Sequence, residues 1–253
     1  MNPAQNDPES TTFGFESIDA SRKTQRVQGV FDSVASRYDL MNDLMSLGLH
    51  RLWKRHLVAL ARPKPGQVLL DCAAGTGDVS ALLYPYLQGQ GRLIVSDLNP
   101  AMLEIARDRL IDQNISHNVD YVLCNGEALP FADHTIDLIT IAFGLRNFTQ
   151  KDQGLSEMYR VLKPGGRLLI LEFSKVQCQW IAPAISAYCH HLLPKLGQWI
   201  TQDGDSYRYL AESIDRHPDQ ATLKARLSAQ GFSHCQVLNH FAGLVAIHTG
   251  CKL

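Results

Sequence analysis

The segment Val68-Leu69-Leu70-Asp71-Cys72-Ala73-Ala74-Gly75-Thr76-Gly77-Asp78 joins an apolar run that ends in an acid to a turn with two glycines. A second apolar run, Leu93-Ile94-Val95-Ser96, ends in Asp97, twenty positions after Gly77. Strand, glycine loop, helix, strand and carboxylate in this order are typical of the first half of a nucleotide-binding α/β sheet.

The loop departs from the dinucleotide-binding pattern Gly-x-Gly-x-x-Gly. Gly75 and Gly77 supply its first two glycines, but Ser80 occupies the third position. Asp71 and Asp78 bracket the loop, so a pyrophosphate would meet two carboxylates there. The same charges favour a cationic ligand.

S-adenosylmethionine fits this charge pattern because it carries a sulfonium, an ammonium and an adenosine but no phosphate. We expect Asp97 to accept hydrogen bonds from both ribose hydroxyls, as an acid at the end of the second strand does for NAD. Asn99 is placed to cap the next helix, with Pro100 at its first position. A NAD site, and a purely structural turn in which Asp71 caps a helix, are the alternatives.

Composition limits the function classes. The chain has 253 residues, a net charge of −1 and 45% hydrophobic residues, which suits a globular domain and gives no basic field for nucleic acid. Its six cysteines are scattered without a Cys-x-x-Cys pair, so we expect neither a metal site nor a disulfide scaffold. The first residues lack the basic start and apolar core of a signal peptide, so we expect a cytoplasmic protein with reduced thiols.

Strand and helix patterns alternate from residue 67 onward, which predicts a mostly parallel, doubly wound sheet of seven strands. The Lys163-Pro164-Gly165-Gly166 segment predicts a sharp turn before the fifth strand. The last two strands predict an antiparallel hairpin. The expected strands are 67–71, 92–96, 119–123, 136–142, 167–173, 234–240 and 243–249, and the expected helices are 78–88, 100–112, 151–162 and 220–230.

Three segments flank or interrupt this core of a single domain, residues 25–253. Residues 1–24 are polar, and we expect a flexible terminus. Residues 25–64 predict a helical cap over the cofactor, with one helix spaced on Phe31 to Met45. Residues 178–203 predict an apolar helical insertion broken by Pro183 and Pro194, too interrupted to span a membrane and better suited to an interface or a substrate.

Seven further segments form a recognisable set. They are residues 31–39 (FDSVASRYD), 41–46 (MNDLMS), 50–54 (HRLWK), 143–147 (FGLRN), 159–166 (YRVLKPGG), 205–214 (DSYRYLAESI) and 217–220 (HPDQ). Together they resemble the ubiquinone/menaquinone biosynthesis C-methyltransferases, the UbiE/MenG family, which has the Rossmann-like class I methyltransferase fold. The resemblance covers the chain from about residue 11.

The resemblance implies S-adenosylmethionine-dependent methylation of a ring carbon in a polyprenylated quinol. The substrates it implies are 2-polyprenyl-6-methoxy-1,4-benzoquinol and demethylmenaquinol. The family usually has glycine where Ala74 stands, and often serine where Ala142 stands. The implied cofactor residues are Asp71, Gly75, Thr76, Gly77, Asp97, Leu98, Asn125, Gly126 and Ala142.

Arg146 and Asn147 follow the carboxyl end of the fourth strand, where open α/β sheets place ligands. With the resemblance, we expect Arg146 to stabilise a developing phenolate and Asn147 to orient a water or hydroxyl. Arginine is too basic to act as an ordinary general base. Tyr207 and Tyr209 are the expected lining of the ring pocket. The alternatives are an ion pair for the arginine and helix packing for the tyrosines.

Two other functions stay open. One is a small-molecule methyltransferase acting on oxygen or nitrogen, and the other is a non-catalytic S-adenosylmethionine-binding component of a quinone-synthesis complex. The resemblance is also compatible with a homodimer and with peripheral contact at the inner face of the membrane.

Overall fold

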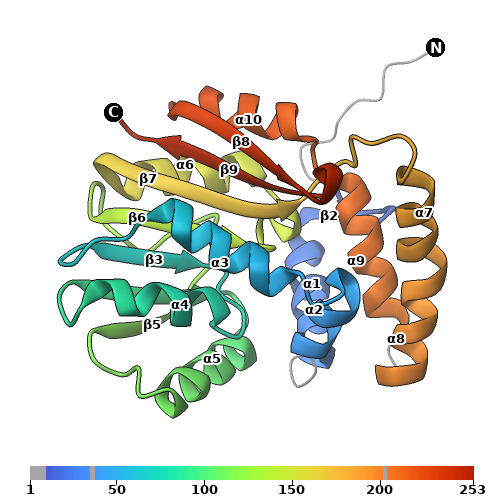
Figure 1. Ribbon diagram of the computed structural model, residues 1–253, viewed down its shortest axis with the longest axis horizontal. Helices are drawn as coiled ribbons and strands as arrows, with labels where there is room; N and C mark the ends of the chain where they lie inside the picture. Colours follow the sequence, from blue (N-terminus) through green and yellow to red (C-terminus); the bar gives the residue numbers. More distant parts are fainter. Residues whose placement is uncertain (1–9, 35–37, 202–203) are drawn as a thin grey trace.

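The computed structural model describes residues 10–34, 38–201 and 204–253. Seven strands form one sheet in the order β5-β4-β3-β6-β7-β9-β8 (Figure 1). The strands from β5 to β7 are parallel, while β9 runs antiparallel to β7 and β8. The predicted fold class is therefore confirmed. The strands are β3 (Val68–Cys72), β4 (Arg92–Asp97), β5 (Val119–Leu123), β6 (Ile136–Ala142), β7 (Leu162–Phe173), β8 (Ser233–His240) and β9 (Val245–Cys251).

Helices cover both faces of the sheet because successive side chains of each strand point to opposite sides. Leu69 packs in one core and its neighbour Leu70 in the other. The first core contains side chains of α3 (His50–Ala61), α4 (Asp78–Leu83) and α5 (Pro100–Asp112). The second contains side chains of α6 (Lys151–Val161) and α10 (Gln220–Ala229).

A group of helices lies beside the carboxyl ends of the parallel strands, at the right of Figure 1. Two come from the start of the chain and the others from the apolar insertion and the helix that follows it. They are α1 (Ala20–Val34), α2 (Tyr38–Ser46), α7 (Ala182–Ala187), α8 (Leu193–Thr201) and α9 (Gly204–Arg216). No helix in the described ranges is long and apolar enough to cross a bilayer.

The start of the chain differs from the expected flexible terminus. Residues 10–19 form a hairpin of β1 (Ser10–Phe13) and β2 (Glu16–Asp19), and α1 begins at Ala20. Residues 1–9 lie outside the described residues. The helix expected from Phe31 to Met45 is two helices, α1 and α2, and residues 35–37 between them are also outside the description.

Two turn expectations also change. Ile136 pairs with Leu162 and Leu138 with Arg167, so residues 163–166 bulge out within β7 instead of preceding it. Pro183 lies in the first turn of α7, where its missing N–H costs nothing, so it starts this helix. Pro194 follows a single π turn, η4 (Tyr188–Leu192), which joins α7 to α8 without a break.

Candidate functional site

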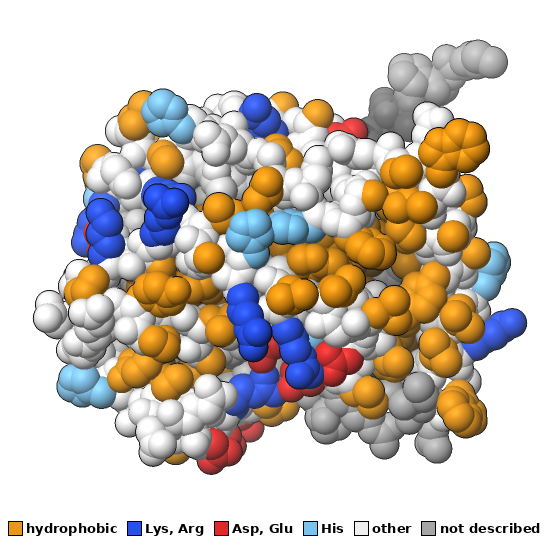
Figure 2. Space-filling view, viewed as in Figure 1, with side chains coloured by type: hydrophobic (Ala, Val, Ile, Leu, Met, Phe, Trp, Pro, Cys, Tyr) orange, Lys and Arg blue, Asp and Glu red, His pale blue; other side chains and the backbone are white. Residues whose placement is uncertain are grey.

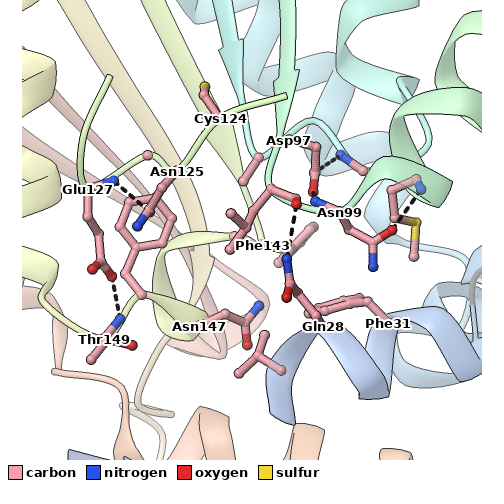
Figure 3. A pocket seen from close by; sticks show the side chains of 18 residues that line it. Gln28, Phe31, Asp97, Asn99, Cys124, Asn125, Glu127, Phe143, Asn147 and Thr149 are labelled. Carbon is pink, nitrogen blue, oxygen red and sulfur yellow. Dashed lines mark hydrogen bonds between the residues drawn. The ribbon is translucent and has the colours of Figure 1, made fainter. Parts of the chain in front are cut away.

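A pocket lies where β3, β4 and β6 end, under helix α1 (Figure 3). Its position is the one that a parallel sheet gives to a ligand. Among the described residues no lysine, arginine or histidine lines it. Its lining residues are Val27, Gln28, Phe31, Ala73, Gly75, Asp97, Leu98, Asn99, Met102, Cys124, Asn125, Gly126, Glu127, Phe143, Gly144, Asn147, Phe148 and Thr149.

Asp97 stands at the end of β4 with its carboxylate held by backbone amides. Oδ2 accepts the N–H of Gly75 at 2.8 Å, and Oδ1 accepts the N–H of Asn99 at 2.9 Å. Each oxygen keeps a further lone pair toward the pocket, which suits two ribose hydroxyls. Burial raises the pKa of Asp97, and the backbone hydrogen bonds oppose this rise. Asn99 also caps α5 through its side chain, as predicted, by accepting the N–H of Met102 at 3.0 Å.

Asn125 and Gly126 form the next part of the wall, after β5. Asn125 Oδ1 accepts the N–H of Glu127 at 2.9 Å, which leaves its Nδ2 donor group for a ligand. Gly126 lies against the ring of Phe148, and a Cβ there would be 2.4 Å from that ring. With Leu98 opposite, these residues make a slot of apolar walls and amide edges that suits an adenine.

The charge of the pocket favours a cation, as predicted. The acidic residues responsible are not the predicted pair, Asp71 and Asp78. The two carboxyl groups that line it, among the described residues, are those of Asp97 and Glu127. Lys23 and Lys151 lie near Glu127 behind the wall. No base lines the pocket itself among the described residues, so a diphosphate would meet the Asp97 carboxylate directly, whereas a sulfonium and an ammonium would be attracted. The donor set therefore fits S-adenosylmethionine and disfavours NAD, although neither Asp71 nor Asp78 lines the pocket.

Asp71 lies below the loop, 1% exposed, as a structural acceptor. It accepts Ser80 Oγ at 2.6 Å and Thr140 Oγ1 at 2.9 Å. Ser80, in the place of the third glycine, thus ties α4 to β3. Burial raises the pKa of Asp71 to about 6, against the effect of these hydrogen bonds.

Asp71→Asn is expected to change how stability depends on pH. As the pH rises from about 4 to 7, Asp71 ionises first in the unfolded chain, which destabilises the folded wild type. The variant lacks this effect, so the difference in unfolding free energy should move by about 3 kcal/mol in its favour over that range. Urea unfolding of both proteins at each pH checks this, and a difference that stays constant with pH would contradict it.

Asp78 takes part in a polar cluster on the other side of the loop. Its carboxylate accepts Lys54 Nζ at 2.7 Å and forms an ion pair with Arg109, which also pairs with Asp39. Thr76 Oγ1 donates to Asp39 at 3.2 Å, so this hydroxyl faces the cluster and not the pocket. The charge of Asp78 is therefore already compensated.

Of the other predicted cofactor residues, some line the pocket and some do not. Gly75 and Leu98 line the pocket. Gly77 has φ +82° and lies against α5, where a Cβ would be 3.1 Å from that of Ala106, so its role is the close packing of two helices. Ala142 packs at the margin of the first core and is not among the lining residues.

Arg146 is buried beneath the pocket, in the short helical turn η3 (Leu145–Asn147). Its Nη1 donates to Glu172 Oε1 at 2.8 Å, and Glu172 Oε2 accepts the Arg146 N–H at 3.1 Å. Both side chains are at most 2% exposed. The guanidinium also hydrogen-bonds the Phe143 carbonyl and lies over the ring of Phe173 at 5.5 Å. Arg146 is thus a buried ion pair that fixes η3.

Asn147, the neighbour of Arg146, does line the pocket (Figure 3). Its Oδ1 accepts the hydroxyl of Tyr209 at 3.2 Å, which joins α9 to the site. Tyr207 lies elsewhere: it is fully buried against Gly197, where a Cβ would be 2.3 Å from its ring. Tyr207 was expected to line the ring pocket, but it is buried elsewhere, and the alternative role, helix packing, accounts for its position.

The sequence predicted a helical cap over the cofactor from residues 25–64, but not which side chains of α1, or of the loop after β6, line the pocket. Gln28 donates through Nε2 to the Leu98 carbonyl at 3.2 Å and closes the pocket together with Phe31. Phe143 has φ +58°, a conformation that is strained for a bulky residue and often marks a functional position. No local pattern signals these residues, because they reach the pocket only through tertiary packing.

Comparisons with known proteins match nearly the whole chain. The model of the ubiE/COQ5 methyltransferase family matches residues 19–252. A protein of Teredinibacter turnerae named ubiquinone/menaquinone biosynthesis C-methyltransferase UbiE is 51% identical over 246 residues, 97% of this chain and 99% of that protein. A protein of the same name from Klebsiella pneumoniae is 51% identical over 244 residues, 96% of this chain and 97% of that protein.

Solved structures share the fold at low identity. A SAM-dependent methyltransferase from Aquifex aeolicus aligns with a TM-score of 0.61 and 16% identity, covering 85% of this chain and 98% of that one. At this identity the likeness concerns the fold alone.

Proposed function

The chain belongs to the ubiE/COQ5 methyltransferase family, and we propose that it methylates a ring carbon of a polyprenylated quinol in ubiquinone or menaquinone biosynthesis. S-adenosylmethionine is its cofactor and supplies an electrophilic methyl group when bound. The quinols that we propose are 2-polyprenyl-6-methoxy-1,4-benzoquinol and demethylmenaquinol. The observation that carries the proposal is the placement of Asn147 in the same pocket as Asp97 and Asn125.

Different residues of the pocket are placed to bind different parts of the cofactor. Asp97 is set to hold the ribose, Asn125 and the surface left open by Gly126 the adenine, and the glycine loop the amino-acid end. Gln28 and Phe31 of α1 cover the pocket, with Gln28 bonded to the Leu98 carbonyl next to Asp97, and shield it from water. Exclusion of water and fixed orientation are the main means by which a protein accelerates a group transfer.

A carbon of the quinol ring becomes a nucleophile when a hydroxyl of the quinol begins to lose its proton. We propose that Asn147 receives this hydroxyl, directly or through a water, since it lines the pocket in the turn that follows β6, four residues after Phe143. The buried Arg146 lies outside the pocket lining with its charge compensated by Glu172, and we propose that this pair fixes η3 and so holds Asn147 in place. Tyr209 orients the Asn147 amide.

Product analysis with a panel of acceptors tests the proposal. We expect mass gain of one methyl group on prenylated benzoquinol or naphthoquinol and none on catechol or amine acceptors. Methylation of only the oxygen or nitrogen acceptors would support a different small-molecule methyltransferase. Binding of S-adenosylmethionine without turnover of any acceptor would support a non-catalytic component of a quinone-synthesis complex.

Tyr209→Phe removes the hydroxyl that orients Asn147. We expect kcat to fall about three- to tenfold and the unfolding free energy to fall by about 1 kcal/mol, the contribution of one hydrogen bond. Burial raises the pKa of Tyr209 to about 12, so the hydroxyl donates throughout the neutral range and the loss should be the same from about pH 6 to pH 9. Steady-state kinetics across that range measure it, with an unchanged kcat as the opposing result.

We also propose that the protein works in the cytoplasm at the inner face of the membrane, where a substrate with an isoprenoid tail resides. Support comes from Trp180 and Trp199 of the insertion, which are 93% and 83% exposed. The basic side chains of α3 offer less support, because Lys54 is buried against Asp78 and Arg51 pairs with Asp43. Binding to vesicles should weaken in a Trp180→Ala/Trp199→Ala variant.

We further propose a homodimer or a larger quinone-synthesis complex, and sedimentation tests both.

A further inference from the structure

A second cavity, of about 310 Å³, lies on the far side of Phe143 from the cofactor pocket. It is enclosed by α2, α3, β7, α7 with η4, α9 and the turn η5 (Phe241–Gly243) that follows β8. No charged side chain is among the described residues that line it. Its two hydroxyls are engaged within the protein: Ser46 Oγ donates to the Asn42 carbonyl, and Tyr188 donates to the Leu44 carbonyl. The cavity therefore suits a hydrocarbon.

The outer end of the cavity is a mouth of exposed apolar side chains. Leu47 is 71% exposed and Phe241 is 51% exposed, and both line the cavity. Both also have a left-handed backbone, with φ +50° and +45°. Leu47 occupies the position after α2 that usually takes glycine, with the Gly48 N–H bonded to the Asp43 carbonyl. Large apolar side chains that are exposed and have a strained backbone are typical of contact with an apolar ligand.

Hydrophobic side chains continue outward from this mouth. Ile181, at the start of α7, is also partly exposed and lines the cavity. Figure 2 shows hydrophobic side chains gathered on this face over α7 and α8, at the right, and extending toward the middle of the view. A chain that leaves the cavity here would meet an apolar surface and not water.

The inner end of the cavity adjoins the cofactor pocket through three aromatic rings. Phe173 and Trp53 line the cavity, and Phe143 lines the cofactor pocket. The ring centroids of Phe143 and Phe173 are 4.9 Å apart, and those of Phe143 and Trp53 are 6.4 Å apart. The Phe143 ring is thus the partition between a polar site that contains Asn147 and an apolar cavity that opens to the surface.

We propose that this cavity is the binding site for the isoprenoid tail of the quinol, with the ring in the cofactor pocket and the tail leaving between Leu47 and Phe241. For one ligand to occupy both compartments the Phe143 ring must turn aside, and its left-handed backbone, with φ +58°, marks it as the residue that does so. The assignment rests on the proposed function. An uncharged tail attached to a polar ring matches the two compartments. A fatty acid would require a base for its carboxylate, which neither lining provides among the described residues.

Substrates of graded tail length test the proposal in the full-length protein. With benzoquinols that carry zero, one, two or three isoprene units, KM should fall about tenfold for each of the first units, while kcat changes little. Ala184→Phe, on an exposed position of α7 that borders the cavity, should narrow the cavity, raise KM for the three-unit quinol at least about tenfold and leave the tail-less quinol unaffected. Ala187→Phe, on an exposed position of α7 outside the lining, is the matched control.

A binding measurement without turnover separates this proposal from the proposed function. In a Trp180→Phe/Trp199→Phe background, Trp53 is the remaining tryptophan, and a three-unit quinone should quench its fluorescence in the Ala187→Phe protein but less in the Ala184→Phe protein. Turnover with a KM indifferent to tail length, or quenching equal in both variants, overturns the tail site. Absence of turnover with these four benzoquinols and with the corresponding naphthoquinols contradicts the proposed function, and the quenching then decides the tail site alone.

Discussion

Asp97→Ala is expected to weaken S-adenosylmethionine binding at least about 100-fold and to abolish turnover at ordinary cofactor concentrations. A carboxylate that receives two ribose hydroxyls makes two charge-assisted hydrogen bonds, each contributing about 1.5–3 kcal/mol. The variant also leaves the amides of Gly75 and Asn99 without their acceptor, so the loop and the start of α5 lose their fixed geometry. The substitution should thus change the Kd for S-adenosylmethionine more than it changes kcat.

Titration calorimetry of the folded variant measures this loss. Asp120→Ala is a suitable control, because Asp120 lies on the adjoining strand β5 in an exposed pair with Arg92 and should bind the cofactor as the wild type does. Asp97→Asn keeps one acceptor oxygen and should fall between the two. A Kd for Asp97→Ala within threefold of the wild type would show that the ribose is held elsewhere.

Arg146→Met is expected to lower the unfolding free energy by about 3–5 kcal/mol, since it leaves the Glu172 carboxylate buried without its partner. The double variant Arg146→Met/Glu172→Leu removes both charges and should recover most of this stability. Comparison of the two separates the structural effect of the pair from its chemical effect. Chemical denaturation of the three proteins gives the stabilities.

Turnover should recover only in part with stability. The double variant also removes the hydrogen bonds from Arg146 to Glu172 and to the Phe143 carbonyl, so η3 holds Asn147 less firmly and kcat should stay about tenfold below the wild type. Because one positive and one negative charge are removed together, the pH–rate profile should keep its wild-type position. A stable double variant with wild-type kcat would limit the pair to stability, and a profile shifted upward would show that the Arg146 charge acts on the quinol hydroxyl.

The sheet was predictable from the sequence because its strands are apolar runs separated by strong turn signals. Asp97 was identified by its distance from Gly77, since a βαβ unit of this length brings the end of β4 beside the loop. The cap of α5 by Asn99 was a local pattern and is confirmed. Features of this kind depend on near neighbours in the chain and can be read without coordinates.

The charges of the site were not predictable in the same way. Asp71 and Asp78 lie close to the loop in sequence, yet Asp71 points into the sheet and Asp78 toward Lys54 and Arg109. Which way a carboxylate turns depends on partners far along the chain, such as Thr140. The same holds for Arg146, whose partner Glu172 lies on the next strand, and for the lining from α1.

Transfer of a carbon-labelled methyl group from S-adenosylmethionine to a prenylated quinol, followed by magnetic resonance of the product, tests the central claim most directly. The account predicts a single labelled methyl bonded to a ring carbon, absent from the product mixture of Asp97→Ala. A labelled methyl on a quinol oxygen, or no labelled quinol at all from a protein that binds the cofactor, would contradict it.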